Sequence, residues 1–315
     1  MASYNNMGGA PKRATFRDLR AWRKERKAKV KDLSFVVPSS PSDPTELESY
    51  AETPRFAWVG HSTFLLQSGG MNILTDPVWA ERMGFERRLS PPGIAVEHLP
   101  DIDIVLLSHS HYDHLHIPSL RFLKGNPIHL VPEGVGSLLL RKGLSNVKQF
   151  GWWESAKVGK LAFTFVPAEH WTRRTLWDMN RSHWGGWIIE TGRDEEEESR
   201  LDAKKTVYFA GDSGYFPGFA EIGKRFPAID IALMPIGAYE PEWFMAPQHV
   251  SPEQAVQAFM DVGATTFVPM HYGAFRLADD TPREALDRLH AAWQANGLSS
   301  GRLLVPKLGE LVPIH

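Results

Sequence analysis

The chain contains no cysteine among its 315 residues. This absence excludes disulfide bonds, zinc sites built from thiolates and a cysteine nucleophile, and it fits a reducing compartment. The chain also lacks any apolar stretch of the ~18 residues that a membrane-spanning helix needs. Its start, MASYNNMGG, lacks the charged and apolar regions of a signal peptide. We therefore expect a cytoplasmic protein that is soluble or peripherally bound to a membrane.

An excess of positive charge is confined to the start of the chain. Residues 1–32 hold ten Lys and Arg against three Asp and Glu, whereas the remainder holds 25 basic and 34 acidic residues. The spacing of Phe16, Leu19 and Trp22 predicts a basic helix over residues 16–30. Such a helix suits an anionic lipid surface or packing on the protein with its charged face in solvent. Because nothing else in the chain is basic, we expect no nucleic-acid partner.

Strands and helices alternate after the basic segment. Residues 38–46, PSSPSDPTE, have the composition of a linker, so we predict a basic N-terminal helix and linker over residues 1–54 and a globular domain over residues 55–315. Residues 56–67 and 71–75 read as the two strands of a hairpin. The acidic run 194–198 predicts a solvated loop. Two runs of strands, each accompanied by helices, indicate an α/β layered domain.

The stretch SHSHYDHL, residues 108–115, carries the strongest chemical signal and directly follows a short apolar strand. Neutral imidazole and ionised carboxylate are the ligands that Zn²⁺ accepts where no thiolate is available. In an extended segment His109 and His111 project to the same side, so they can share one ion. Asp113 and His114 follow where the chain must turn and are more easily aimed at a second ion. The alternative is a polar loop that happens to be rich in histidine.

Three further polar residues stand directly after apolar strands, as His109 does: His170, Asp212 and His271. Rigid strands can aim such side chains at a shared site. A single histidine of this kind is more often a structural residue. Together with the loop, however, these residues make seven ligands, a number that suits two ions with a bridging carboxylate and a bridging water.

These motifs resemble those of the metallo-β-lactamase superfamily. The matching segments include WVGHSTFLL with LTDP, SHSHYDHL, HWTRRTLWDMN, FAGDSGY and MHYGAF. Within the superfamily the chain is similar to the N-acyl phosphatidylethanolamine-hydrolysing phospholipase D group, for which GAYEPEWFM followed by QHV is the narrowest signal. The resemblance implies the metallo-β-lactamase fold, an αβ/βα four-layer sandwich with a dinuclear site between two sheets.

The resemblance also implies roles for individual residues. Each zinc ion has three ligands of its own, and one carboxylate bridges: His109, His111 and His170 on one ion, Asp113, His114 and His271 on the other, and Asp212 between them. Asp113 is also expected to be catalytic, since it can orient the nucleophile or take its proton.

Further residues are expected around the ligands. The narrow motif places His249, Tyr239 and Trp243 near the substrate, although His249 also suits a structural position at the entry to a helix. Asp76 and His61 are expected to orient the ligands. For His61 the alternative is a plain histidine at the end of a strand.

The expected chemistry follows from the charge of such a site. Divalent ions bring the pKa of a bound water down to roughly 7, and an ion pair suits in-line displacement at phosphorus. We therefore predict a dinuclear zinc hydrolase of phospholipase D type, acting as a phosphodiesterase on N-acyl phosphatidylethanolamine or a related glycerophospholipid, with a metal-bound hydroxide as nucleophile. A metal-dependent lactone or ester hydrolase on the same fold stays open, as does a metal-stabilised binding protein without turnover. Other divalent metals, peripheral membrane contact and an oligomer are compatible with the same sequence.

Overall fold

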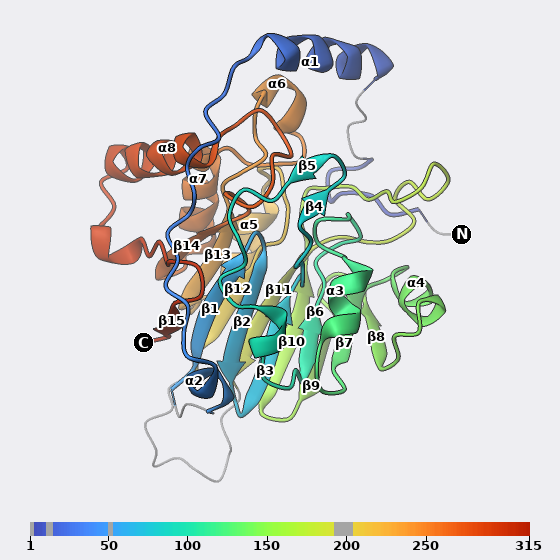
Figure 1. Cartoon of the computed structure of the whole chain (residues 1–315), viewed down its shortest axis with the longest axis vertical. Helices are drawn as coiled ribbons and strands as arrows, with labels where there is room; N and C mark the ends of the chain where they lie inside the picture. The colour runs from blue at the N-terminus through green and yellow to red at the C-terminus, as the bar shows by residue number, and fades with distance from the viewer. Residues whose placement is uncertain (1–2, 11–14, 50–52, 192–203) are drawn as a thin grey trace.

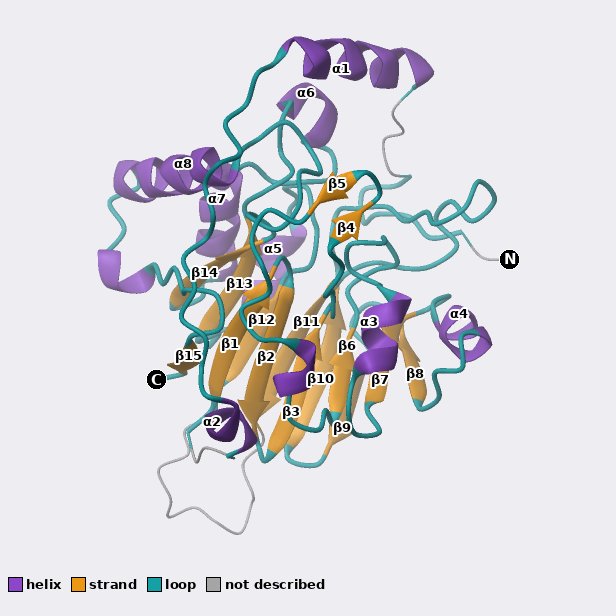
Figure 2. Ribbon diagram, in the orientation of Figure 1, coloured by secondary structure: helices purple, strands orange, loops and turns teal. Residues whose placement is uncertain are grey.

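Two β-sheets form the centre of the molecule. The computed structural model describes residues 3–10, 15–49, 53–191 and 204–315, and Figure 1 and Figure 2 show its strands side by side with helices outside them. The strand orders are β15-β1-β2-β3-β6-β7-β8 in the first sheet and β14-β13-β12-β11-β10-β9 in the second, with β4 and β5 in a separate ribbon.

The first sheet contains β1 (Arg55–Gly60), β2 (Thr63–Ser68), β3 (Met71–Thr75), β6 (Ile104–Leu106), β7 (Ile128–Pro132), β8 (Val147–Phe150) and β15 (Leu311–Pro313). The second contains β9 (Ser155–Val158), β10 (Leu161–Val166), β11 (Gly186–Thr191), β12 (Thr206–Phe209), β13 (Ile231–Pro235) and β14 (Thr266–Met270). The small ribbon is made of β4 (Arg82–Met83) and β5 (Glu86–Arg87).

Side chains alternate between the two faces of the first sheet. Phe56 and Trp58 of β1 belong to the core that includes the second sheet, whereas Ala57 and Val59 pack with the helices on the outer face, as successive residues of a strand must. The outer helices are α3 (Ile117–Phe122) and α4 (Gly136–Arg141). The second sheet is covered by α5 (Gly218–Arg225), α7 (Pro252–Val262) and α8 (Pro282–Ala295). The layers therefore run helix, sheet, sheet, helix, and the predicted four-layer α/β sandwich is confirmed.

Local sequence signals explain why α7 begins and ends where it does. Ser251 and Gln254 form a capping box, and Pro252 occupies the first turn, where its missing N–H costs nothing. Gly263 ends the helix in a left-handed conformation with φ 72°. The bounds of α7 therefore follow from signals within its own sequence.

The prediction of one strand over residues 56–67 is wrong. This segment forms two antiparallel strands, β1 and β2, whose connection passes through His61 at φ 55°. The following hairpin is confirmed, because Ser68 pairs with Met71 across the β2–β3 turn. The unexpected turn places His61 between the end of β1 and the start of β2 instead of within a strand.

The basic helix α1 (Phe16–Ala28) packs on the protein above α6 (Glu242–Met245), as Figure 1 shows. The ring of Trp22 stacks on that of Phe244 with centroids 5.0 Å apart, and its indole N–H donates to Asp279 Oδ2 at 3.1 Å. Arg26 pairs with Glu86 at 3.1 Å. Of the two arrangements considered for this helix, the structure shows the packed one, with most of its other basic side chains exposed.

The residues after α1 also run along the protein. Short α2 (Pro44–Glu48) begins inside the predicted linker, and the backbone N–H of Ser40 donates to Leu308 O at 2.8 Å. The division of the chain after residue 54 stays a prediction. The acidic run 194–198 lies outside the described residues. None of the helices that the structure describes has both the length and the apolar character that a bilayer crossing needs.

Candidate metal centre

The predicted ligands follow the carboxyl ends of strands from both sheets. Strands β3, β6 and β7 are parallel neighbours in the first sheet, as are β12, β13 and β14 in the second. Strand β10 points the same way as β12, because both are antiparallel to β11. The carboxyl ends of such strands are where an open α/β sheet builds its binding sites. The structure accordingly brings all seven predicted ligands together.

A glycine lets Asp212 enter this site. Gly211 follows β12 with φ 64°, and a Cβ there would lie 2.8 Å from both Gly185 O and Ser108 Cβ. Only glycine combines this left-handed turn with so close an approach. Asp212 is thereby buried beside the histidine loop.

Three imidazoles form the first cluster of the site. His109 Nε2 lies 2.9 Å from His111 Nδ1, and His170 Nε2 lies 3.2 Å from the same atom. The Nδ1 atom of His170 is hydrogen-bonded to the carbonyl of Gln248 at 2.9 Å, which directs Nε2 toward the other rings. Burial lowers the pKa of His111 to about 3 and that of His170 to about 4. Both rings are therefore neutral at pH 7, as metal ligands must be.

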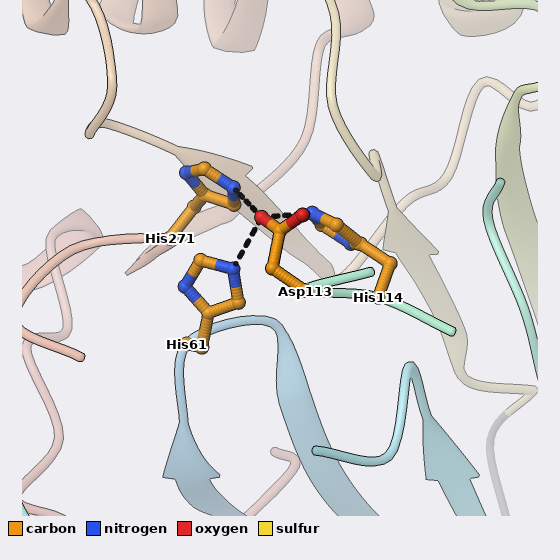
Figure 3. Close-up of side chains that lie close together, drawn as sticks. All are labelled: His61, Asp113, His114 and His271. Carbon is orange, nitrogen blue, oxygen red and sulfur yellow. Dashed lines mark hydrogen bonds and ion pairs between the residues drawn. The ribbon is translucent and has the colours of Figure 1, made fainter. Parts of the chain in front are cut away.

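Two carboxylates and two imidazoles form the second cluster. Asp212 Oδ2 lies 3.1 Å from His114 Nε2, and its Oδ1 lies 3.2 Å from His271 Nε2. Asp113 Oδ2 approaches the same two nitrogens at 3.3 and 3.5 Å and His61 Nε2 at 3.0 Å, an arrangement drawn in Figure 3. Burial alone would raise the pKa of either carboxyl group, but the neighbouring His114 holds both well below the usual value.

Asp212 connects the two clusters. Its Oδ2 atom also lies 3.9 Å from His109 Nε2 and 4.0 Å from His170 Nε2. Burial would lower the pKa of His271, yet Asp212 and Asp113 more than offset this and raise it to about 9, so this ring carries a proton that a bound metal ion would displace. A negative charge shared between two sets of imidazoles is what a bridging ligand requires.

The donor atoms fit divalent cations. Among the described residues, the buried atoms without any hydrogen-bond partner include His114 Nε2, His271 Nε2 and Asp212 Oδ1 of the second cluster. Leaving such a group unsatisfied costs about 1–3 kcal/mol, and a cation between them would remove that cost. The ligand atoms of His109, His111 and His170 all lie within 4.8 Å of one another, and the same holds for those of His61, Asp113, His114 and His271. Nitrogen and oxygen donors without thiolate suit zinc and other first-row divalent metals.

Asp76 and His61 lie directly behind the ligands. Asp76 Oδ2 is 2.7 Å from His114 Nδ1, and its Oδ1 accepts the backbone N–H of Ser108 at 2.7 Å. Asp76, His61 and the predicted ligand His271 all have positive φ, of 33°, 55° and 61°. Backbone strain of this kind costs about 1–3 kcal/mol per residue and gathers at functional sites.

The three residues predicted near the substrate differ in their surroundings. His249 Nδ1 lies 3.8 Å from Asp212 Oδ2, so the structure brings His249 to the ligands. Tyr239 is fully buried in the core with the Arg288 guanidinium 4.6 Å from its ring centroid, which favours a structural role. Trp243 is half exposed and lines a cavity of about 530 Å³.

Sequence reasoning missed Arg174, which braces the histidine loop. Its guanidinium donates to the carbonyls of Ser110 at 2.7 Å and Leu115 at 2.9 Å, and it lies 3.9 Å from the ring centroid of Tyr112. From the sequence alone, an arginine that binds backbone carbonyls cannot be told apart from an arginine whose charge faces solvent. The segment HWTRRTLWDMN carries it, but the segment alone does not say which arginine turns inward.

Comparison with known proteins agrees with this fold. The Beta-lactamase superfamily domain matches residues 71–272. The solved structure of Igni18, a metallo hydrolase from the archaeon Ignicoccus hospitalis, superposes with a TM-score of 0.62 at 22% sequence identity, over 84% of this chain and 99% of that one. The chain belongs to the β-lactamase superfamily of metallo-hydrolases, and the family predicted from the sequence is confirmed.

Two relatives extend the comparison. The N-acyl-phosphatidylethanolamine-hydrolyzing phospholipase D 1 of Caenorhabditis elegans is 32% identical over 284 residues, which cover 83% of this chain and 76% of the relative. An uncharacterised protein of Mycobacterium tuberculosis is 38% identical over 248 residues, covering 75% of this chain and 63% of the relative. The chain thus spans somewhat less than two thirds of the mycobacterial protein.

Proposed function

We propose that this protein is a dinuclear metal-dependent phosphodiesterase of phospholipase D type acting on N-acyl phosphatidylethanolamine or a related glycerophospholipid. The observation that carries the proposal is the position of Asp212, whose carboxylate lies 3.1–4.0 Å from nitrogens of both histidine clusters. Similarity to the nematode phospholipase supports the substrate class. Zinc is the metal that we propose, with His109, His111 and His170 as one ligand set, Asp113, His114 and His271 as the other, and Asp212 as the bridge.

The chain's own residues have separate tasks in this proposal. When bound, two divalent ions supply Lewis acidity and lower the pKa of water toward 7. Asp113 is held by His61 at 3.0 Å, so its carboxylate is oriented to direct the nucleophile or to take its proton. His249 is buried beside Asp212 with its Nδ1 atom lacking a partner among the described residues. It is therefore free to donate a hydrogen bond to a phosphate oxygen.

The surroundings of the site support a lipid substrate. The cavity of about 530 Å³ is lined by Tyr215, Trp243 and Pro247 together with Glu242 and with Glu169, the neighbour of the proposed ligand His170. This volume lies within the range of small-molecule sites. The exposed basic residues of α1 are suited to the anionic surface on which such a substrate resides. We therefore include peripheral membrane contact in the proposal.

The test is turnover by metal-quantified protein of a generic phosphodiester, of N-acyl phosphatidylethanolamine and of a lactone, measured side by side. We expect phosphodiester cleavage, with release of phosphatidic acid from the lipid. Hydrolysis of the lactone without cleavage of either phosphodiester would replace this proposal by an ester hydrolase. Absence of all three activities in protein carrying two ions would point instead to a binding protein.

A further inference from the structure

The first described residues of the chain lie against the proposed metal centre. Asn6, which is buried, accepts the backbone N–H of His170 at 3.1 Å through its Oδ1 atom. The same oxygen accepts the indole N–H of Trp184 at 2.8 Å. The Nδ2 atom of Asn6 donates to Glu169 Oε1 at 2.9 Å. One side chain near the N-terminus is thus bonded to the ligand-bearing residue and to its neighbour, 164 and 163 residues away.

Two features hold Asn6 in this position. Asn6 and Gly9 exchange backbone hydrogen bonds at 2.9 and 3.0 Å, which closes a tight turn. Tyr4 stacks on His183 with ring centroids 4.5 Å apart, and its N–H donates to Asn180 O at 2.9 Å. Burial and a hydrogen bond to Glu133 raise the pKa of the Tyr4 hydroxyl to about 12. The segment is therefore anchored at Tyr4 and closed into a local turn after Asn6.

We propose that Asn6 is a positioning residue that holds His170 in its metal-binding orientation, so that residues 4–9 form part of the metal centre. This inference rests on the proposed role of His170 as a ligand. It assigns a task in the active site to a segment that precedes both the basic helix and the domain predicted from residue 55.

The physical reason lies in the two hydrogen bonds that His170 itself makes outside the imidazole cluster. Its ring is fixed by the bond from Nδ1 to the carbonyl of Gln248, and its backbone by the bond from N to Asn6. Without the Asn6 oxygen, the buried N–H of His170 loses its acceptor, whereas Trp184 keeps a second one, Ala168 O at 3.1 Å. Because a buried donor cannot stay unpaired without cost, the strand end carrying His170 shifts and Nε2 moves away from His109 and His111.

The chain offers a matched control beside the test residue. Asn5 has the same side chain, is exposed and makes no side-chain hydrogen bond within the part of the chain that the structure describes. In full-length protein, Asn6→Ala should weaken the binding of one of the two ions by ~10–100-fold, the range found when residues behind metal ligands are changed. Asn5→Ala should leave both affinities unchanged. Chelator competition measures the affinities, and the absorption spectrum of cobalt-substituted protein reports distortion of the three-histidine ligand set.

A second variant distinguishes the loss of these hydrogen bonds from misfolding of the protein. Asn6→Asp combined with Glu169→Gln exchanges the amide and the carboxylate, so that the hydrogen bond between the two side chains and the acceptor for His170 are both kept. We expect this pair to restore the metal affinity and the cobalt spectrum that Asn6→Ala loses. Equal affinities for Asn6→Ala and Asn5→Ala, or failure of the exchanged pair to restore binding, would overturn the inference.

The readout separates this inference from the proposed function. Metal affinity is measured without a substrate, so a protein that binds two ions but cleaves no phosphodiester would refute the phosphodiesterase and leave the role of Asn6 intact. If the wild-type protein holds no ion through His170, the inference fails with the ligand assignment.

Discussion

The Nδ1 atom of His114 lies 2.7 Å from Oδ2 of Asp76, and both side chains are fully buried. This contact fixes the ring so that Nε2 faces Asp113 and Asp212 at 3.3 and 3.1 Å. A carboxylate behind an imidazole also increases the basicity of the nitrogen that faces the metal. Asp76 therefore influences the site without being one of its seven proposed ligands.

We predict that Asp76→Asn lowers metal affinity by ~10–100-fold, because the charge that orients and polarises His114 is lost. Equilibrium dialysis against zinc measures the change. Asp101→Asn is the control, since this exposed carboxylate lies shortly before β6. Retention of wild-type affinity by Asp76→Asn would show that His114 does not depend on this contact.

Purified protein should carry close to two zinc or similar ions per chain, and Asp212→Ala should lose metal and activity together. The reason is that Asp212 contacts both clusters, so its removal weakens both ion positions. Elemental analysis by mass spectrometry, with protein quantified by amino-acid analysis, gives the stoichiometry. Fully active wild-type protein with one ion or none would contradict the dinuclear site.

His249→Ala should reduce turnover at least ~10-fold while the metal content stays at the wild-type value, because His249 is not counted among the ligands. The magnitude is that of a general acid–base or hydrogen-bonding group acting on the substrate. The exposed His290 provides a control, since His290→Ala removes an imidazole far along α8. Parent-like turnover of His249→Ala would return this residue to a structural role.

His183 should make the protein less stable in acid. Burial lowers its pKa from 6.5 to about 4, so the folded protein keeps it neutral while the unfolded chain takes up a proton. Stability is therefore lost as pH falls from about 6.5 to about 4, with a slope of at most ~1.4 kcal/mol per pH unit from this group. His183→Phe keeps a ring against Tyr4 and removes the titration. Urea denaturation at several pH values should show a shallower slope for the variant, and an unchanged slope would refute the assignment.

The exposed face of α1 should bind anionic vesicles. Each cation near such a surface contributes roughly 1 kcal/mol, and five basic residues of the helix are exposed: Arg17, Arg20, Arg23, Lys24 and Lys27. Replacing all five by Gln should abolish sedimentation with anionic vesicles, and added salt should do the same to the wild type. Hydrolysis of a small soluble phosphodiester should not change, because Trp22 and Arg26 still hold the helix on the protein. Undiminished vesicle binding by the five-fold variant would exclude this surface.

Patterns with a local cause were predictable from the sequence. Helix α7 carries its own capping box and terminating glycine, and β10 coincides with the apolar run LAFTFV. The turn at His61 was not predictable, because VGHST contains none of the dipeptides that mark a tight turn. The positive φ of His61 accompanies contacts made by residues far away in the sequence, such as the hydrogen bond from His271 N to His61 O at 3.1 Å.

The candidate site shows the same division. The predicted ligands could be recognised because several histidines and aspartates follow directly after apolar strands. The family resemblance then assigned each of them to one of the two ions. Asn6 and Arg174 act through hydrogen bonds to backbone atoms far away in the sequence, and such bonds leave no pattern of spacing. Tyr239 lay within the narrow motif, yet it is packed in the core, since a motif marks a segment without saying which of its side chains face inward.

The contact between Asn6 and His170 has a consequence for biosynthesis. Asn6 is translated 164 residues before its hydrogen-bond partner His170, and Asp212 and His271 follow later still. At ~5–20 residues per second, residues 4–9 wait about 8–33 s for His170 to be translated, and longer for His271. On the proposed ligand assignment, metal acquisition is a late event in the maturation of this polypeptide, and the nascent chain must keep residues 4–9 available until the second sheet has formed.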